Sequence, residues 1–171
     1  MDKENELPKR KHPRLKGFDY SSSGAYFITI CTQNRRCTLS KIEAENVKKT
    51  KYGIIAEEQL LSLNERYPSL TVDNYVIMPN HIHVILFLNN ETAGASPRPT
   101  VMDIVCAYKS LTARECKKNG FEKKLFQDSF FEHVIRGRED YTETVKYICK
   151  NPIRWCNDEL YTKNEGENEH E

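Results

Sequence analysis

NYVIMPNHIHVILFL, residues 74–88, contains two apolar runs separated by the turn-like residues Met78-Pro79-Asn80. The runs are rich in β-branched and aromatic residues, which are enriched in strands. Pro79 lacks the N–H that an interior strand position donates, so it fits the junction between strands. The pattern therefore predicts two strands, roughly 71–78 and 81–88.

Two histidines open the second of these strands. Because side chains alternate between the faces of a strand, His81 and His83 would share one face, with Cα atoms roughly 6.5 Å apart. Ile82 and Val84 would point the other way, into a core. Two imidazoles on one face of a strand that otherwise only packs are unusual, and they are close enough to bind one metal ion.

Periodicity and turn residues predict the other elements. They indicate a strand at 26–32, a helix at about 53–66, a helix at about 101–119 capped by Thr100 and ended by Gly120, a strand at 129–136 and a helix at about 138–150. Residues 33–50 favour no single structure beyond a short strand near Val47. The order β-α-β-β-α-β-α predicts an α+β, ferredoxin-like fold, with an antiparallel sheet and two helices on one face. That fold serves many functions, so the site must decide among them.

Length and composition bound the class of protein. The chain has 171 residues, 38% hydrophobic and 30% charged, as expected of one globular domain. It contains no apolar run of the roughly 20 residues that span a membrane, and the charged N-terminus does not resemble a secretory signal. We therefore expect a cytoplasmic protein without a membrane partner. None of its six cysteines falls in a C-x-x-C pair, which argues against a structural zinc site.

The formal net charge of +1 is unevenly distributed. Residues 158–171 hold six acids and one base, so the rest of the chain carries +6. We expect three regions: a basic arm at 1–16, a folded domain at 17–157 and a disordered acidic tail at 158–171. The arm either binds phosphates or is simply a solvated end. Its clustered bases are Lys9, Arg10, Lys11, Arg14 and Lys16.

A second chemical feature lies in the last predicted helix. Tyr147 and Asn151 are four residues apart and share a helix face. Alone, the tyrosine reads as a packing residue and Asn151, before Pro152, as a helix end. Beside two histidines, the Asn151 carbonyl can serve as a third metal ligand, leaving positions for phosphate oxygens and water. Tyr147 would then direct its hydroxyl at a bound phosphate, although a phenol needs a metal or base to become a good nucleophile.

These motifs resemble those of a known family. VIMPNHIH, residues 76–83, resembles the HUH motif of the single-tyrosine transposases. Tyr147-Ile148-x-x-Asn151-Pro152 is similar to the nucleophile helix of the REP-associated tyrosine transposases. Further matches are residues 11–20 followed by YFIT (26–29), Lys109-Ser110, and FFEHVIR (130–136). The resemblance extends from about residue 9 to 155.

The resemblance implies a metal-dependent endonuclease and strand transferase acting on single-stranded DNA near hairpin-forming repeats, with 17–157 as its catalytic domain. His81 and His83 would bind Mg²⁺ or Mn²⁺, and Tyr147 would form a 5′-phosphotyrosine intermediate, leaving a 3′-hydroxyl. The insertion-sequence members carry Gln where this chain has Asn151. Those members dimerise and exchange the tyrosine helix, whereas REP-associated relatives can act as monomers, so both a homodimer and a monomer fit.

Several other residues are candidate DNA contacts. Lys109 and Arg136 contact phosphates or are solvated surface residues, and Tyr20 is placed to stack on an unpaired base. A DNA substrate would also favour the DNA-binding role of the basic arm. His133, by strand alternation, is more consistent with a structural role.

Three alternative functions differ in the chemistry they need. A nucleotide hydrolase of the histidine-triad kind would need a third histidine where Ile85 stands. A non-catalytic hairpin DNA- or RNA-binding protein on the same fold would need neither metal nor Tyr147. An inactive relative of a transposase would keep hairpin binding alone, which the intact histidine and tyrosine set argues against.

Overall fold

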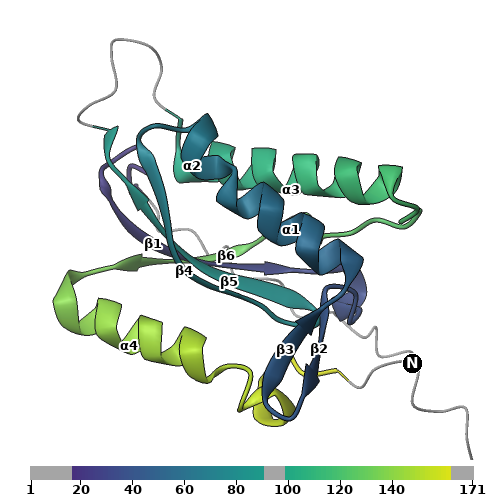
Figure 1. Ribbon diagram of the computed structural model, residues 1–171. Coiled ribbons are helices and arrows are strands. Elements are labelled where there is room, and N and C mark those ends of the chain that lie inside the picture. Colours follow the sequence, from purple (N-terminus) through teal and green to yellow (C-terminus); the bar gives the residue numbers. More distant parts are fainter. Residues whose placement is uncertain (1–16, 91–98, 163–171) are drawn as a thin grey trace, which may run out of the picture.

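A four-stranded antiparallel sheet forms the centre of the computed structural model, which describes residues 17–90 and 99–162. The sheet has the order β4-β5-β1-β6, and its strands are β1 (Gly24–Cys31), β4 (Leu70–Ile77), β5 (His81–Leu88) and β6 (Phe131–Ile135). Helices α1 (Lys51–Leu61), α2 (Leu63–Arg66) and α3 (Val101–Lys118) lie on one face, and α4 (Gly137–Lys150) lies on the other (Figure 1). The predicted α+β, ferredoxin-like arrangement is confirmed.

The observed elements differ from the predicted ones in two places. The helix expected at 53–66 is divided at Ser62, whose hydroxyl donates to the Gln59 carbonyl and so competes with the regular helical pattern. The ambiguous residues 33–50 form a short 3-10 turn, Gln33–Arg35, and a hairpin of β2 (Ser40–Glu43) and β3 (Asn46–Lys49). Within the described ranges, no helix has the length and apolar character of a membrane span.

Alternation along the central strands separates a core from the site. Ile82 and Val84 on β5 are buried in the large core beneath α1 and α3, as predicted. The opposite face of the sheet packs a smaller cluster against α4, centred on Ile85 and Ile148. His81 and His83 lie on this second face, paired in register with Cys31 and Thr29 of β1, so α4 covers them. The result is a polar site between sheet and helix.

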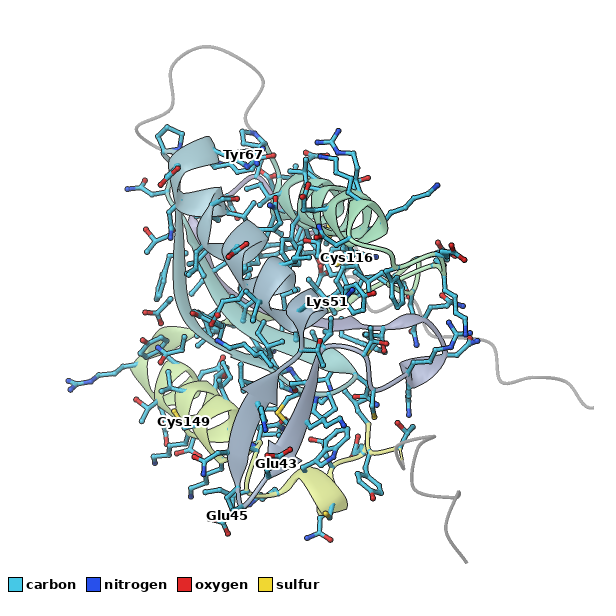
Figure 2. The ribbon with its side chains drawn as sticks, turned by 45° about the vertical axis from the view of Figure 1, so that its right-hand side comes forward. Glu43, Glu45, Lys51, Tyr67, Cys116 and Cys149 are labelled. Atoms are coloured by element: carbon cyan, nitrogen blue, oxygen red, sulfur yellow. The ribbon has the colours of Figure 1, made fainter. Side chains whose placement is uncertain are left out.

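The β2–β3 hairpin extends away from the sheet, and Glu43 and Glu45 mark its outer end (Figure 2). Its base contributes to the site, because the Leu39 N–H donates to the Pro79 carbonyl at 3.0 Å. Pro79 belongs to the tight turn between β4 and β5, which is closed by the Met78 N–H donating to the His81 carbonyl at 2.9 Å. The position of this turn sets where β5 and its histidines begin.

Gly53 in the first turn of α1 permits a close approach that supports this turn. A Cβ at Gly53 would lie 1.9 Å from the carbonyl oxygen of Leu39, which is backbone and has little freedom to move. The same carbonyl accepts hydrogen bonds from the N–H and hydroxyl of Thr50, the N-cap of α1. Helix α1 is thereby held against the segment that fixes Pro79.

Gly53→Ala should lower the free energy of unfolding by about 1 to 3 kcal/mol, the range for overpacking a tight interior. The clash outweighs the roughly 1 kcal/mol that alanine normally gains over glycine in a helix. Urea unfolding followed by circular dichroism measures the change. Gly24→Ala is the matched control, because a Cβ there meets only ordinary contacts of 3.8 Å or more. A Gly53→Ala protein as stable as wild type would contradict the close approach.

Candidate metal and nucleophile site

The two histidines are buried at the centre of the site. His81 is 0% and His83 2% exposed, and their ring centroids lie 4.4 Å apart. Burial lowers the pKa of His81 to about 4, although the charge of Asp158 opposes the effect. Burial, followed by the influence of His81, lowers the pKa of His83 well below its usual value. Both rings are therefore neutral near pH 7, which is the form that binds metals.

Asn80 sets the orientation and tautomer of His81. Its amide nitrogen donates to the Leu160 carbonyl at 2.7 Å and to the Arg35 carbonyl at 3.2 Å, so its oxygen must face the other way. That oxygen lies 2.8 Å from Nδ1 of His81 and accepts the ring proton. A neutral His81 then has an unprotonated Nε2, directed into the site. The sequence identified Asn80 only as a turn residue.

Two buried ring nitrogens at the centre of the site lack a matched hydrogen-bond partner. Nε2 of His81 lies 3.3 Å from Oδ1 of Asn151, whose amide nitrogen is already directed at Asp158, 2.8 Å away. Two lone pairs therefore face each other without a proton between them. Nδ1 of His83 contacts the Thr29 hydroxyl at 2.8 Å, and its buried Nε2 has no hydrogen-bond partner among the described residues. A divalent cation would satisfy these groups, so the residues present fit a metal ion.

Asp158 completes a group of three potential ligands with His81 and His83, each offering one atom within 4.8 Å of the others. The expectation placed Asp158 in a disordered tail beginning at that residue. Residues 158–162 instead fold against the site, and 163–171 lie outside the described part of the chain. Trp155 is buried, its ring centroid lies 6.0 Å from that of His81, and it packs on Tyr161. These two aromatic residues are the feature of the sequence that indicates a folded chain beyond residue 157.

Tyr147 lies beside the histidines of its own chain. Its ring centroid is 5.2 Å from that of His83 and 6.0 Å from that of Phe27, in edge-on contacts, and the residue is 46% exposed. It lines a cavity of about 330 Å³ with His83, Thr29 and Arg35. Burial raises the pKa of the phenol, and the charges of Asp158 and Glu159 add to the effect. The hydroxyl is therefore protonated at neutral pH and is open to a ligand in the cavity.

Helix α4 carries Tyr147 into this position because its apolar residues recur at helical spacing. Thr144 and Ile148 are buried toward the sheet, and Asn151, 2% exposed, follows as the C-cap. At the other end the Asp140 carboxylate accepts from the N–H of Arg136, the N-cap residue. The predicted sharing of one side of the helix by Tyr147 and Asn151 brings both to the histidines.

The remaining predicted DNA contacts lie away from the histidines. Arg136 is exposed at the far end of α4, about 16 Å from Tyr147 along the helix axis. Lys109 donates to the carbonyls of Gln127 and Asp128, on the side of the sheet covered by α3. Tyr20 packs at the edge of the core beneath α3. Lys9, Arg10, Lys11, Arg14 and Lys16 lie outside the described residues.

Two further residues clarify the site. The His133 ring contacts the Asp140 carboxylate at 2.9 Å near the start of α4, a surface contact that agrees with the structural role expected for it. Arg35 was not predicted as a site residue, yet it lines the Tyr147 cavity from a turn in which its φ is 53°. Its guanidinium is the cation of that cavity, but the pair Arg35-Arg36 in an ambiguous segment of the sequence gives no signal of this.

No protein-family model matches the chain. An uncharacterized protein of Haemophilus influenzae is 30% identical over 167 residues, which cover 89% of this chain and 93% of that protein. A REP-associated tyrosine transposase of Escherichia coli is 27% identical over 135 residues, covering 79% of this chain and 70% of that protein. A solved structure of a REP-associated tyrosine transposase bound to a REP hairpin aligns with a TM-score of 0.61 at 22% identity, covering 82% of this chain and 74% of that one.

Fold and site together define a class of protein. Its members have an α+β domain with an antiparallel sheet, a buried pair of histidines on one strand and a partly exposed tyrosine on the helix that covers them. The solved structure supports the fold. The named sequence relatives point to the same branch: over about four fifths of its length the chain is similar to REP-associated tyrosine transposases.

Proposed function

We propose that the protein is a metal-dependent endonuclease and strand transferase for single-stranded DNA beside hairpins, with Tyr147 as nucleophile. The observation that supports this best is that His83 and Tyr147 line the same cavity, with their ring centroids 5.2 Å apart. The Nε2 atom of His83 has no hydrogen-bond partner among the described residues. Tyr147 and the two histidines lie together within a single chain. This supports action in cis, within a monomer or within each subunit of a dimer.

The groups of the chain divide the work of the reaction. His81, His83 and an oxygen from Asn151 or Asp158 would hold Mg²⁺ or Mn²⁺, which when bound polarises the scissile phosphate. The Tyr147 oxygen attacks phosphorus, loses its proton and replaces the 3′-oxygen of the preceding nucleotide, which leaves as a 3′-hydroxyl. Arg35 stands where it can pair with the phosphate oxygens. The reverse attack by a 3′-hydroxyl rejoins a strand, because the phosphotyrosine bond replaces the phosphodiester bond.

DNA recognition is proposed from the family and from charge. The E. coli relative is named for REP sequences, and the solved structure holds a REP hairpin. In this chain Lys9, Arg10, Lys11, Arg14 and Lys16 would follow the phosphate backbone, with Lys109, Arg136 and Tyr20 as further contacts. The non-catalytic alternative, a hairpin-binding protein without cleavage, requires the same surface but neither Tyr147 nor a metal.

The test is cleavage of a single-stranded oligonucleotide that carries a hairpin taken from DNA flanking the coding region. With Mg²⁺ or Mn²⁺, a 3′-labelled strand should migrate with the protein on a denaturing gel, because its 5′-phosphate is bound to tyrosine. A 5′-labelled strand should be released with a free 3′-hydroxyl. EDTA should abolish both products. Binding without an adduct at any metal concentration would favour the non-catalytic alternative, and an adduct on the 5′-labelled fragment would contradict the proposed polarity.

A further inference from the structure

Two side chains at the site offer an oxygen as the third ligand, Asn151 from the end of α4 and Asp158 from the segment that follows. Asp158 forms the compact group with the two histidines, in which all three ligand atoms lie within 4.8 Å. We propose that Asp158 binds the divalent ion directly and that Asn151 is a positioning residue for it. The inference rests on the proposed function, because that function supplies the ion.

Charge distinguishes the two oxygens. The Asn151 side chain offers a neutral amide oxygen, whereas Asp158 offers a carboxylate beside the two histidines. Mg²⁺ and Mn²⁺ are hard cations that prefer carboxylate oxygens. Within residues 17–90 and 99–162, no lysine or arginine forms an ion pair with this carboxylate. Its charge therefore remains available to a cation.

Hydrogen bonds hold the carboxylate in place without using all of its acceptor capacity. Oδ2 accepts from the Asn151 amide at 2.8 Å, and Oδ1 accepts from the Leu160 N–H at 2.7 Å. A carboxylate oxygen has two lone pairs, so each retains one for a metal. Asn151 is thus connected to both sides of the group, with its oxygen toward His81 and its nitrogen toward Asp158. This is the arrangement of an outer residue that orients two ligands.

The segment that carries Asp158 is tied to the turn that carries the histidines. The Asn80 amide donates to the Leu160 carbonyl at 2.7 Å and to the Thr162 hydroxyl at 3.1 Å, while its oxygen orients His81. A single buried side chain therefore places both the first histidine and the returning segment. Metal affinity should depend on residues 158–162, a part of the chain outside the resemblance that identified the histidines.

The test is Mn²⁺ binding to the full chain, measured by isothermal titration calorimetry without DNA. Asp158→Asn should weaken binding by about tenfold or more, at least the loss seen when a supporting contact of a metal site is removed. Glu159→Gln is the matched control, since it removes an equal charge from the adjacent residue, whose carboxylate lies outside the group of three. It should leave the affinity nearly unchanged. An equal loss of Mn²⁺ affinity in both variants would mean that Asp158 acts only through its charge at a distance, and it would overturn the proposal.

The same titration separates this inference from the proposed function. If the wild type binds Mn²⁺ and His83→Ala abolishes binding, the metal site of the proposed function stands. Unchanged affinity in Asp158→Asn would then overturn the role of Asp158 alone. If the wild type does not bind Mn²⁺, both proposals fail. Should Asp158→Asn not fold, Mg²⁺ titration of the unsubstituted chain, followed by carbon-13 resonances, decides: the Asp158 carboxylate should shift and that of Glu159 should not.

Discussion

Tyr147→Phe should abolish the covalent protein–DNA adduct and reduce strand cleavage on the order of 10⁴-fold or more, as expected for loss of a nucleophile. Phenylalanine keeps the ring that packs edge-on against His83 and Phe27, and it removes only the attacking oxygen. Hairpin binding and thermal stability should therefore match the wild type. Cleavage on a denaturing gel, fluorescence anisotropy of a labelled hairpin and thermal unfolding measure the three properties.

Tyr141→Phe is the matched control, because Tyr141 lies on the same helix and its hydroxyl donates to the Asp73 carboxylate at 2.7 Å. Its loss should cost about 1 kcal/mol of stability, a typical value for one hydrogen bond, and leave cleavage intact. An adduct that persists in Tyr147→Phe but disappears in Tyr141→Phe would show that Tyr141, and not Tyr147, is the nucleophile.

Sequence reasoning could predict the features of this site that depend on local periodicity. Strand alternation places His81 and His83 on one face, and the helical repeat brings Tyr147 and Asn151 to one side of α4. The structure adds the relation between the two elements, which depends on Ile148 packing against the second face of the sheet. A periodic pattern alone does not predict which face of the sheet α4 covers.

The parts that sequence reasoning missed depend on contacts between distant segments. Asp158 stands in a polar, acidic stretch whose composition predicts disorder, yet its neighbour Leu160 is held by Asn80, eighty positions earlier. Asn80 itself is explained locally by its turn, so nothing in the sequence reveals that its side chain is buried and orients His81. Buried polar side chains that connect loops are specified by tertiary structure, and here they are the ones that complete the site.

His83→Ala should reduce cleavage on the order of 10³-fold, since several kcal/mol of charge stabilisation are lost with the metal. The wild type should gain thermal stability as Mn²⁺ is added, because a ligand that binds only the folded state raises its stability by mass action. His83→Ala should show no such rise in thermal stability with Mn²⁺. Replacing a histidine with a purely structural role would not remove the response to the metal. The matched control is His133→Ala, on the surface beside Asp140, which should retain both cleavage and the response to Mn²⁺.

Mixing the two inactive proteins tests whether one chain holds a complete site. Tyr147 lies 5.2 Å from His83 of the same chain between ring centroids, so Tyr147→Phe and His83→Ala should not restore cleavage when combined. If the tyrosine helix served a partner's histidines, each mixed dimer would contain one intact site. That site would combine the tyrosine of the His83→Ala chain with the histidines of the Tyr147→Phe chain, and the other site would carry both substitutions. Recovered cleavage in the mixture would therefore reject the cis arrangement while leaving both residues in their catalytic roles. Failure to recover, after the two folded, hairpin-binding proteins have been unfolded and refolded together so that their chains mix, would support a nucleophile and metal ligands that belong to one polypeptide.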